Sequence, residues 1–139
     1  MRPVMTIDDI HAFLREEFPQ MRSRFTVEEI APFRLRLAMA VREEDLRPGG
    51  TISGPAMFTL ADCAFYLATL AMIGPKALTV TTSCAIDFMR KPAPGPLRAE
   101  ARVLKLGRSL SVGDVMIWSD GMDAPVAHAN FTYSIPPNG

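Results

Sequence analysis

The side chain in this chain best suited to chemistry is a single carboxylate, Asp62. Between Arg47 and Lys76 the only other ionisable side chains are Cys63 and Tyr66. The segment around Asp62 is apolar on nearly every side, which is typical of a buried helix. A carboxylate there costs folding free energy unless it is paired or hydrogen-bonded, so an isolated one indicates a role in chemistry. The structural alternative is an acid whose oxygens accept hydrogen bonds from threonine or from the backbone.

The loop in front of this segment has the composition of a helix start that can hold an anion. Residues 47–55 read Arg-Pro-Gly-Gly-Thr-Ile-Ser-Gly-Pro, which predicts a loop. Ser53 or Gly54 is placed to cap a helix, and Pro55 then takes the first helical position, where its missing N–H costs nothing. The free N–H groups and the positive dipole end of such a helix suit the oxyanion of an acyl transfer.

Two further hydroxyls have both a structural and a chemical interpretation. Ser53 is interpreted first as a helix cap, because a serine nucleophile needs a histidine base and neither His11 nor His128 lies in a triad context. Thr81 opens a strand, where threonine is common, but it can also orient water. His128 is expected on the outer face of the last strand as a surface residue.

Basic and aromatic side chains are candidates for holding a substrate. Arg90, Lys91 and Arg108 follow strand ends or turns, where the phosphates of a nucleotide could meet them. Solvation at strand ends explains them equally well. Phe65 and Tyr66 lie on the apolar helix, where they are core residues or line an apolar pocket.

Composition narrows the class of protein. The 139 residues fit one domain with its own core. Equal numbers of acidic and basic residues, 15 of each, argue against a nucleic-acid partner. Two cysteines in apolar stretches read as reduced residues of a cytoplasmic protein, and two isolated histidines predict no metal site. The apolar run 56–73 is long enough to approach a membrane span, but its central aspartate argues against one.

Hydrophobic periodicity and turn residues place the elements that must position these groups. They predict helices over 7–18 and 55–73 and strands over 24–30, 34–42, 78–89, 97–106, 110–118 and 126–135. The whole chain, 1–139, is then one α+β domain: an N-terminal helical segment 1–20, a central helix 55–73, and a flexible tail 136–139. An antiparallel sheet, meandering through its last four strands, wraps around the central helix. Long edge strands predict a dimer.

The candidate residues also carry a family likeness. The matching motifs are Gly50-x-x-Ser53-Gly54-Pro55-x-x-x-x-Leu60-Ala61-Asp62, Thr81, Phe88-Met89-Arg90-x-Pro92 and Gly107-Arg108. In order and spacing, over about residues 34–134, they resemble the hotdog-fold acyl-CoA thioesterases of the phenylacetate-degradation (PaaI-like) type. The resemblance implies a hotdog dimer that can pair into a tetramer, with active sites at the dimer interface.

The resemblance also assigns roles to residues. It implies that Asp62 acts on the thioester as general base or nucleophile and that the Gly54 N–H polarises the carbonyl. The catalytic set implied is Asp62, Gly54, Ser53 and Thr81, and the substrate-binding set is Arg47, Gly50, Pro55, Phe65, Tyr66, Arg90, Lys91, Gly107 and Arg108. Three positions depart from the family pattern, which has Asn at Arg47, His at Ser53 and a second Gly at Pro55.

These observations support one main hypothesis and two alternatives. The main one is a cytoplasmic acyl-CoA thioesterase for small, medium or aromatic acyl groups, with coenzyme A as part of the substrate and no separate cofactor. Along a helix Asp62 lies about 12 Å from Gly54, so the two must meet across a dimer. The first alternative is a hotdog protein that binds acyl-CoA or a lipid-like ligand without turnover. The second, a hydratase, needs a histidine beside the carboxylate, and neither histidine lies near it.

Overall fold

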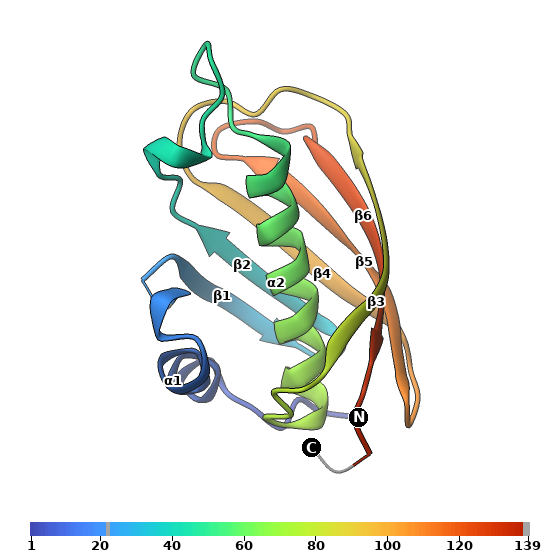
Figure 1. Ribbon diagram of the computed structural model, residues 1–139. Coiled ribbons are helices and arrows are strands. Elements are labelled where there is room, and N and C mark those ends of the chain that lie inside the picture. Colours follow the sequence, from blue (N-terminus) through green and yellow to red (C-terminus); the bar gives the residue numbers. More distant parts are fainter. Residues whose placement is uncertain (22, 138–139) are drawn as a thin grey trace.

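One six-stranded sheet forms the body of the molecule (Figure 1). The computed structural model describes residues 1–21 and 23–137, so the end of the predicted tail, 138–139, lies outside the described residues. The strands are β1 (Phe25–Ala31), β2 (Arg34–Met39), β3 (Val80–Phe88), β4 (Leu97–Leu106), β5 (Leu110–Ser119) and β6 (Ala127–Ser134). Their order in space is β1-β2-β4-β5-β6-β3, and every neighbouring pair is antiparallel.

The predicted central helix, α2 (Gly54–Ile73), lies along one face of this sheet (Figure 1). Ser53 is its N-cap, because the serine hydroxyl accepts a hydrogen bond from the N–H of Ala56 at 3.3 Å. The helix therefore begins at Gly54, and Pro55 takes the second helical position, not the first. Proline fits either position, since neither N–H has a partner within the helix.

The core lies between α2 and the inner face of the sheet. Alternate residues of β4 point inward and are buried: Leu97, Ala99, Ala101 and Val103. Close packing of helix on sheet depends on Gly113 of β5, where a Cβ would lie 2.6 Å from the ring of Phe65. By length and composition α2 could cross a membrane, but 72% of an apolar 18-residue stretch of this helix is buried within the protein. Its apolar character is therefore that of a core helix.

The path of the chain after α2 differs from the predicted meander. β4, β5 and β6 follow one another, but β3 pairs with β6 and forms the edge opposite β1. The connection 89–96 then returns across the sheet to β4. It can reach roughly 26 Å when extended, and the three interstrand steps it crosses total about 14 Å. A long proline-rich connection thus replaces the tight turn that a meander would need.

An N-terminal helix lies at the β1 edge of the sheet (Figure 1). α1 (Ile7–Glu17) begins after the capping box of Thr6, at the residue predicted as its start, and lies beside β1 (Figure 1). His11 Nε2 accepts a hydrogen bond from the backbone N–H of Val27 at 3.2 Å. This bond ties α1 to β1. The short 3-10 helix η1 (Pro19–Met21) then leads into the sheet.

β2 is shorter than the strand predicted over 34–42. The chain leaves the sheet because the backbone N–H of Arg42 donates to the carboxylate of Asp45 at 2.8 Å, which stabilises the 3-10 helix η2 (Glu43–Asp45). Asp45 also forms a buried ion pair with Arg24 at 2.6 Å. These contacts fix the start of the loop that leads to α2.

Candidate active site

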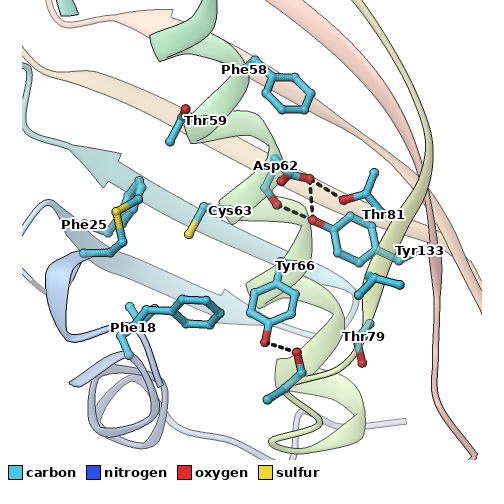
Figure 2. Close-up of a pocket in the computed structure, with 14 residues that line it drawn as sticks. Phe18, Phe25, Phe58, Thr59, Asp62, Cys63, Tyr66, Thr79, Thr81 and Tyr133 are labelled. Atoms are coloured by element: carbon cyan, nitrogen blue, oxygen red, sulfur yellow. Dashed lines mark hydrogen bonds between the residues drawn. The ribbon is translucent and has the colours of Figure 1, made fainter. Parts of the chain in front are cut away.

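Asp62 points from α2 toward the start of β3 and the end of β6 (Figure 2). The hydroxyl of Thr81 donates a hydrogen bond to Asp62 Oδ1 at 2.8 Å. The hydroxyl of Tyr133 lies 2.5 Å from the same oxygen and 3.0 Å from the Asp62 carbonyl oxygen. In the described part of the chain, Asp62 Oδ2 accepts no hydrogen bond. The carboxylate is therefore fixed through one oxygen and has the other available.

The partners of Asp62 are neutral. Among residues 1–21 and 23–137 it takes part in no ion pair. Burial, and next the charge of Asp62, raise the pKa of Tyr133 above its usual value, so this hydroxyl remains a proton donor. Burial, and next Asp62, raise the pKa of Cys63 to about 12. The neighbouring thiol is therefore a poor nucleophile at neutral pH.

A cavity of about 540 Å³ opens beside Asp62. Aromatic rings make up much of its lining, from Phe18, Phe25, Phe58, Tyr66 and Tyr133. The sequence alone suggested that Asp62 is enclosed in the core. In the structure Asp62 is half-buried and lines an apolar cavity. Of the two helix aromatics expected to contact a ligand, Tyr66 lines this cavity. Phe65 does not: it is fully buried and stacks on Phe131 at a centroid distance of 5.6 Å.

A second cavity, of about 600 Å³, lies at the N-terminal end of α2. Its lining includes several of the predicted site residues: Arg47, Ser53, Gly54, Pro55, Arg90 and Lys91. As the first residue of α2, Gly54 has an N–H without a partner in the helix. One guanidinium nitrogen of Arg90 already donates to the Pro125 carbonyl at 2.7 Å, which orients this side chain. The site is basic and adjoins a helix N-terminus, both of which favour anions.

The remaining predicted residues lie elsewhere. Gly50 has φ of +84° and shapes the loop before α2, without lining either cavity. Gly107 and Arg108 form the turn between β4 and β5, at the opposite end of the sheet from the start of α2 (Figure 1). Within one chain they do not meet the other candidates. His128 lies on the outer face, as expected, but it is half-buried and bonded to Asp114 at 3.0 Å.

Sequence reasoning missed the second donor to Asp62 and a wall of the cavity. Tyr133 was part of an ordinary strand pattern, although a buried tyrosine usually finds a partner for its hydroxyl. Leu14, Phe18 and Met21 line the cavity; they come from α1, from its C-cap and from η1, respectively. Their spacing indicated only an amphipathic helix. Nothing local in the sequence shows which segment far along the chain such residues face.

Comparison with known proteins gives the family. A family model described as the thioesterase superfamily matches residues 49–126. The chain belongs to this superfamily. The sequence-based expectations of a hotdog fold, a PaaI-like likeness and a thioester hydrolase are confirmed by this match and by solved relatives.

This thioesterase has similar proteins in several organisms. It is 48% identical to a thioesterase-named protein of Silicibacter sp. TM1040, with a TM-score of 0.90 over 99% of this chain and 96% of that one. It is 29% identical to a mutant of the phenylacetic acid degradation protein PaaI of Thermus thermophilus, with a TM-score of 0.71 over 85% and 99% of the two chains. An esterase-named protein of Thermoplasma volcanium is 30% identical over 96 residues, 68% of this chain and 71% of that protein.

Proposed function

We propose that this thioesterase hydrolyses the thioester of a small, medium or aromatic acyl-CoA, with Asp62 as the group that activates water. The observation that carries the proposal is the asymmetric binding of the carboxylate. Thr81 and Tyr133 both bond to Oδ1, which leaves Oδ2 to accept a proton from water. Neutral donors orient the carboxylate without cancelling its charge, so it can act as a general base.

The reaction also needs a donor for the oxyanion. Water attacks the thioester carbonyl, its proton passes to Asp62, and the carbonyl oxygen becomes an oxyanion. The N–H of Gly54, at the positive end of α2, is suited to bind this oxyanion. The carbon–sulfur bond then breaks, the thiolate leaves as coenzyme A, and the proton held by Asp62 returns to it. Direct attack by Asp62, through an anhydride, uses the same groups.

Gly54 and Asp62 of one chain lie about 12 Å apart along α2, so the site requires a second copy. β3 is an edge strand and leaves Val80 and Phe88 about half exposed, at 52% and 51%. In a two-fold dimer such edges pair antiparallel. The Thr81 end of one β3 then lies beside the Phe88 end of its partner. That pairing brings the Asp62 cavity of one protomer beside the Gly54 cavity of the other.

The second cavity is suited to the nucleotide part of the substrate. Arg47, Arg90 and Lys91 surround it and can bind the phosphates of coenzyme A. The partner's copy of this cavity would adjoin Asp62. These cations would then lie on the coenzyme A side of the thioester. Two free, half-buried cysteines, Cys63 and Cys84, fit a reducing cytoplasm.

The direct test is thiol release from short, medium, long and aromatic acyl-CoAs, with the wild type and Asp62→Asn compared. We expect turnover on part of the panel and a loss of about 10²-fold or more in the variant, with fold and dimer intact. Turnover that is indifferent to Asp62 would refute the mechanism. Binding of intact acyl-CoA without turnover on any member would favour the ligand-binding alternative, which the Ser53 and Arg47 departures motivate.

A heterodimer tests whether the two groups come from different chains. Gly54→Pro removes the N–H donor, and Asp62→Asn removes the base. A purified heterodimer of these two chains has one intact site if the groups act across the interface, and we expect about half the wild-type activity. Each homodimer is expected to be nearly inactive. A heterodimer as inactive as both homodimers would show that Gly54 and Asp62 act within one chain.

A further inference from the structure

The cavity beside Asp62 is closed on one side by the N-terminal part of the chain. Leu14 and Phe18 come from α1 and its C-terminal cap, Met21 from η1, and Phe25 from the start of β1. Phe18 and Phe25 lie opposite β3 in Figure 2. The superfamily match begins at residue 49. This wall therefore belongs to a part of the chain outside the matched region.

The cavity has an exposed end and a buried end. Phe58, near the start of α2, is 37% exposed, whereas Tyr66 is 9% exposed. Asp62 lies between them, one helical turn, or about 6 Å, from Tyr66. An apolar acyl group gains the most free energy at the buried end. With its thioester at Asp62, the acyl group therefore points toward Tyr66 and the N-terminal wall.

Phe18 meets Tyr66 at that buried end. The two rings lie edge to face, with centroids 6.0 Å apart and an interplanar angle of 90°, and Phe13 packs against both at 6.2 Å. The Tyr66 hydroxyl donates to the Ala77 carbonyl at 3.0 Å, so the tyrosine is held in place (Figure 2). An acyl chain that grows along this direction must displace the Phe18 ring.

The wall is anchored at several points. Thr6 caps α1, and the buried side chains Ile10 and Leu14 fix its inner face. The backbone N–H of Val4 donates to the Ala71 carbonyl at 2.7 Å, which joins the segment before α1 to the end of α2. Because these contacts hold α1 against the core, the end of the cavity is a fixed boundary.

We propose that Phe18 is a specificity-determining residue that limits the length of the acyl group. The cavity takes a compact apolar acyl group, aromatic or of short to medium chain, and Phe18 excludes longer chains. This inference rests on the proposed function, since it uses Asp62 as the position of the thioester. It adds a boundary supplied by the N-terminal segment and names the residue that sets it.

The test is the chain-length profile of kcat/KM over saturated acyl-CoAs from butanoyl to hexadecanoyl. Phe18→Ala is expected to move the optimum to longer chains and raise the ratio of long-chain to short-chain kcat/KM by about 10-fold or more, because one methylene in an apolar pocket changes discrimination by at least that factor. Phe18→Trp is expected to move the optimum to shorter chains. Trp118→Ala, which removes an aromatic ring from the outer face of the sheet, is the matched control and should keep the wild-type profile.

A binding measurement separates this inference from the proposed mechanism. S-alkyl-CoA thioethers of the same lengths have no scissile carbonyl, and their dissociation constants by titration calorimetry report the cavity even without turnover. The same shifts are expected in Phe18→Ala and Phe18→Trp. Phe18→Leu, checked by thermal unfolding, replaces Phe18→Ala if that variant does not fold. An unchanged profile in the Phe18 variants, or an equal shift in Trp118→Ala, would overturn the proposal.

Discussion

Two aspartates on opposite sides of the sheet, Asp62 in α2 and Asp114 in β5, show how partners decide what a carboxylate can do. Asp62, on the inner side, is half-buried, bonds to two neutral hydroxyls, and borders a cavity. Asp114, on the outer face of β5, is only 7% exposed and has cationic or basic partners. Arg102 donates to both of its oxygens, at 2.9 and 2.7 Å, and His128 lies 3.0 Å away.

The difference appears in the charge balance of the two sites. Burial alone would raise the pKa of Asp114, but hydrogen bonds from Arg102 and His128, together with their charges, hold it below its usual value. A carboxylate neutralised in this way stabilises the sheet and is unsuited to accept a proton. Asp62 has the opposite arrangement: neutral hydroxyls donate to it, and within residues 1–21 and 23–137 it has no ion-pair partner. The more buried aspartate is therefore structural, and the less buried one is the candidate for chemistry.

The largest expected effect is the contrast in turnover between the two aspartates. Asp62→Asn should lower kcat by about 10²-fold or more, because it removes the proposed base. Asp114→Asn should leave kcat within about twofold, since Asp114 lies across the sheet from the cavity and is separated from the site. Steady-state kinetics on the best acyl-CoA provide the measurement. Comparable losses in both variants would abolish the distinction.

The hydroxyls that hold Asp62 should give the next largest effect. Thr81→Ala and Tyr133→Phe each remove one donor to Oδ1, and we expect kcat to fall by about 10-fold in each because the base loses its orientation. Thr82→Ala is the matched control, since its hydroxyl bonds to the Thr132 carbonyl at 3.1 Å and not to Asp62. If the Thr82 variant lost as much activity as the Thr81 variant, damage to β3 would explain both.

The two aspartate substitutions should affect stability in the opposite order to their effects on turnover. Asp114→Asn removes a charge-assisted pair, and the exposed side of Arg102 limits the cost to about 1 kcal/mol of unfolding free energy. Asp62→Asn should leave the unfolding free energy unchanged or higher, because an uncompensated charge at a functional site is often destabilising. Urea unfolding of the three proteins measures both changes. A larger loss in Asp62→Asn than in Asp114→Asn would contradict the structural role of Asp114.

The pH dependence of stability should identify the Asp114 contribution. The pKa of Asp114 in the folded state is lowered, below the unfolded value of about 3.9. Between these two pKa values the unfolded state binds more protons than the folded state. The contribution is complete above the unfolded pKa and is lost as pH falls through the folded pKa. The stability gap between wild type and Asp114→Asn should therefore narrow below about pH 4. A gap that stays constant down to pH 2 would exclude this linkage.

The smallest effect concerns the thiol beside Asp62. Burial and the Asp62 charge raise the pKa of Cys63 to about 12, so alkylation by iodoacetamide at pH 8 should be slow in a Cys84→Ser background. Asp62→Asn removes the charge and should speed the labelling by a factor of a few, on the order of 2–5, whereas Asp114→Asn should not. Fast labelling of the native wild type, with the unfolded protein as reference, would show that the thiol is not shielded.

The sequence was informative where structure follows from local pattern. The bounds of β4 agree with the prediction because apolar and polar residues alternate from Leu97 to Val103. The bounds of α2 follow from a long apolar run that begins after Ser53-Gly54-Pro55 and ends at Gly74. Asp62 was identified because a charge within such a run needs an explanation. These signals lie within a few residues of one another and need no knowledge of distant contacts.

Other features depended on contacts between segments far apart in the chain. Tyr133 is 71 residues from Asp62, and Phe18 reaches Tyr66 from a separate helix. The place of β3 beside β6 depends on the path of the proline-rich connection across the sheet.

The sequence by itself thus determined the element types, the family and the isolated acid of the apolar helix. The tertiary structure decided which hydroxyls orient that acid, which ring closes the cavity, and which strand edge remains open. The physical reason is that propensity and periodicity act over neighbouring residues, whereas hydrogen-bond partners and cavity walls are selected by the packing of the whole chain.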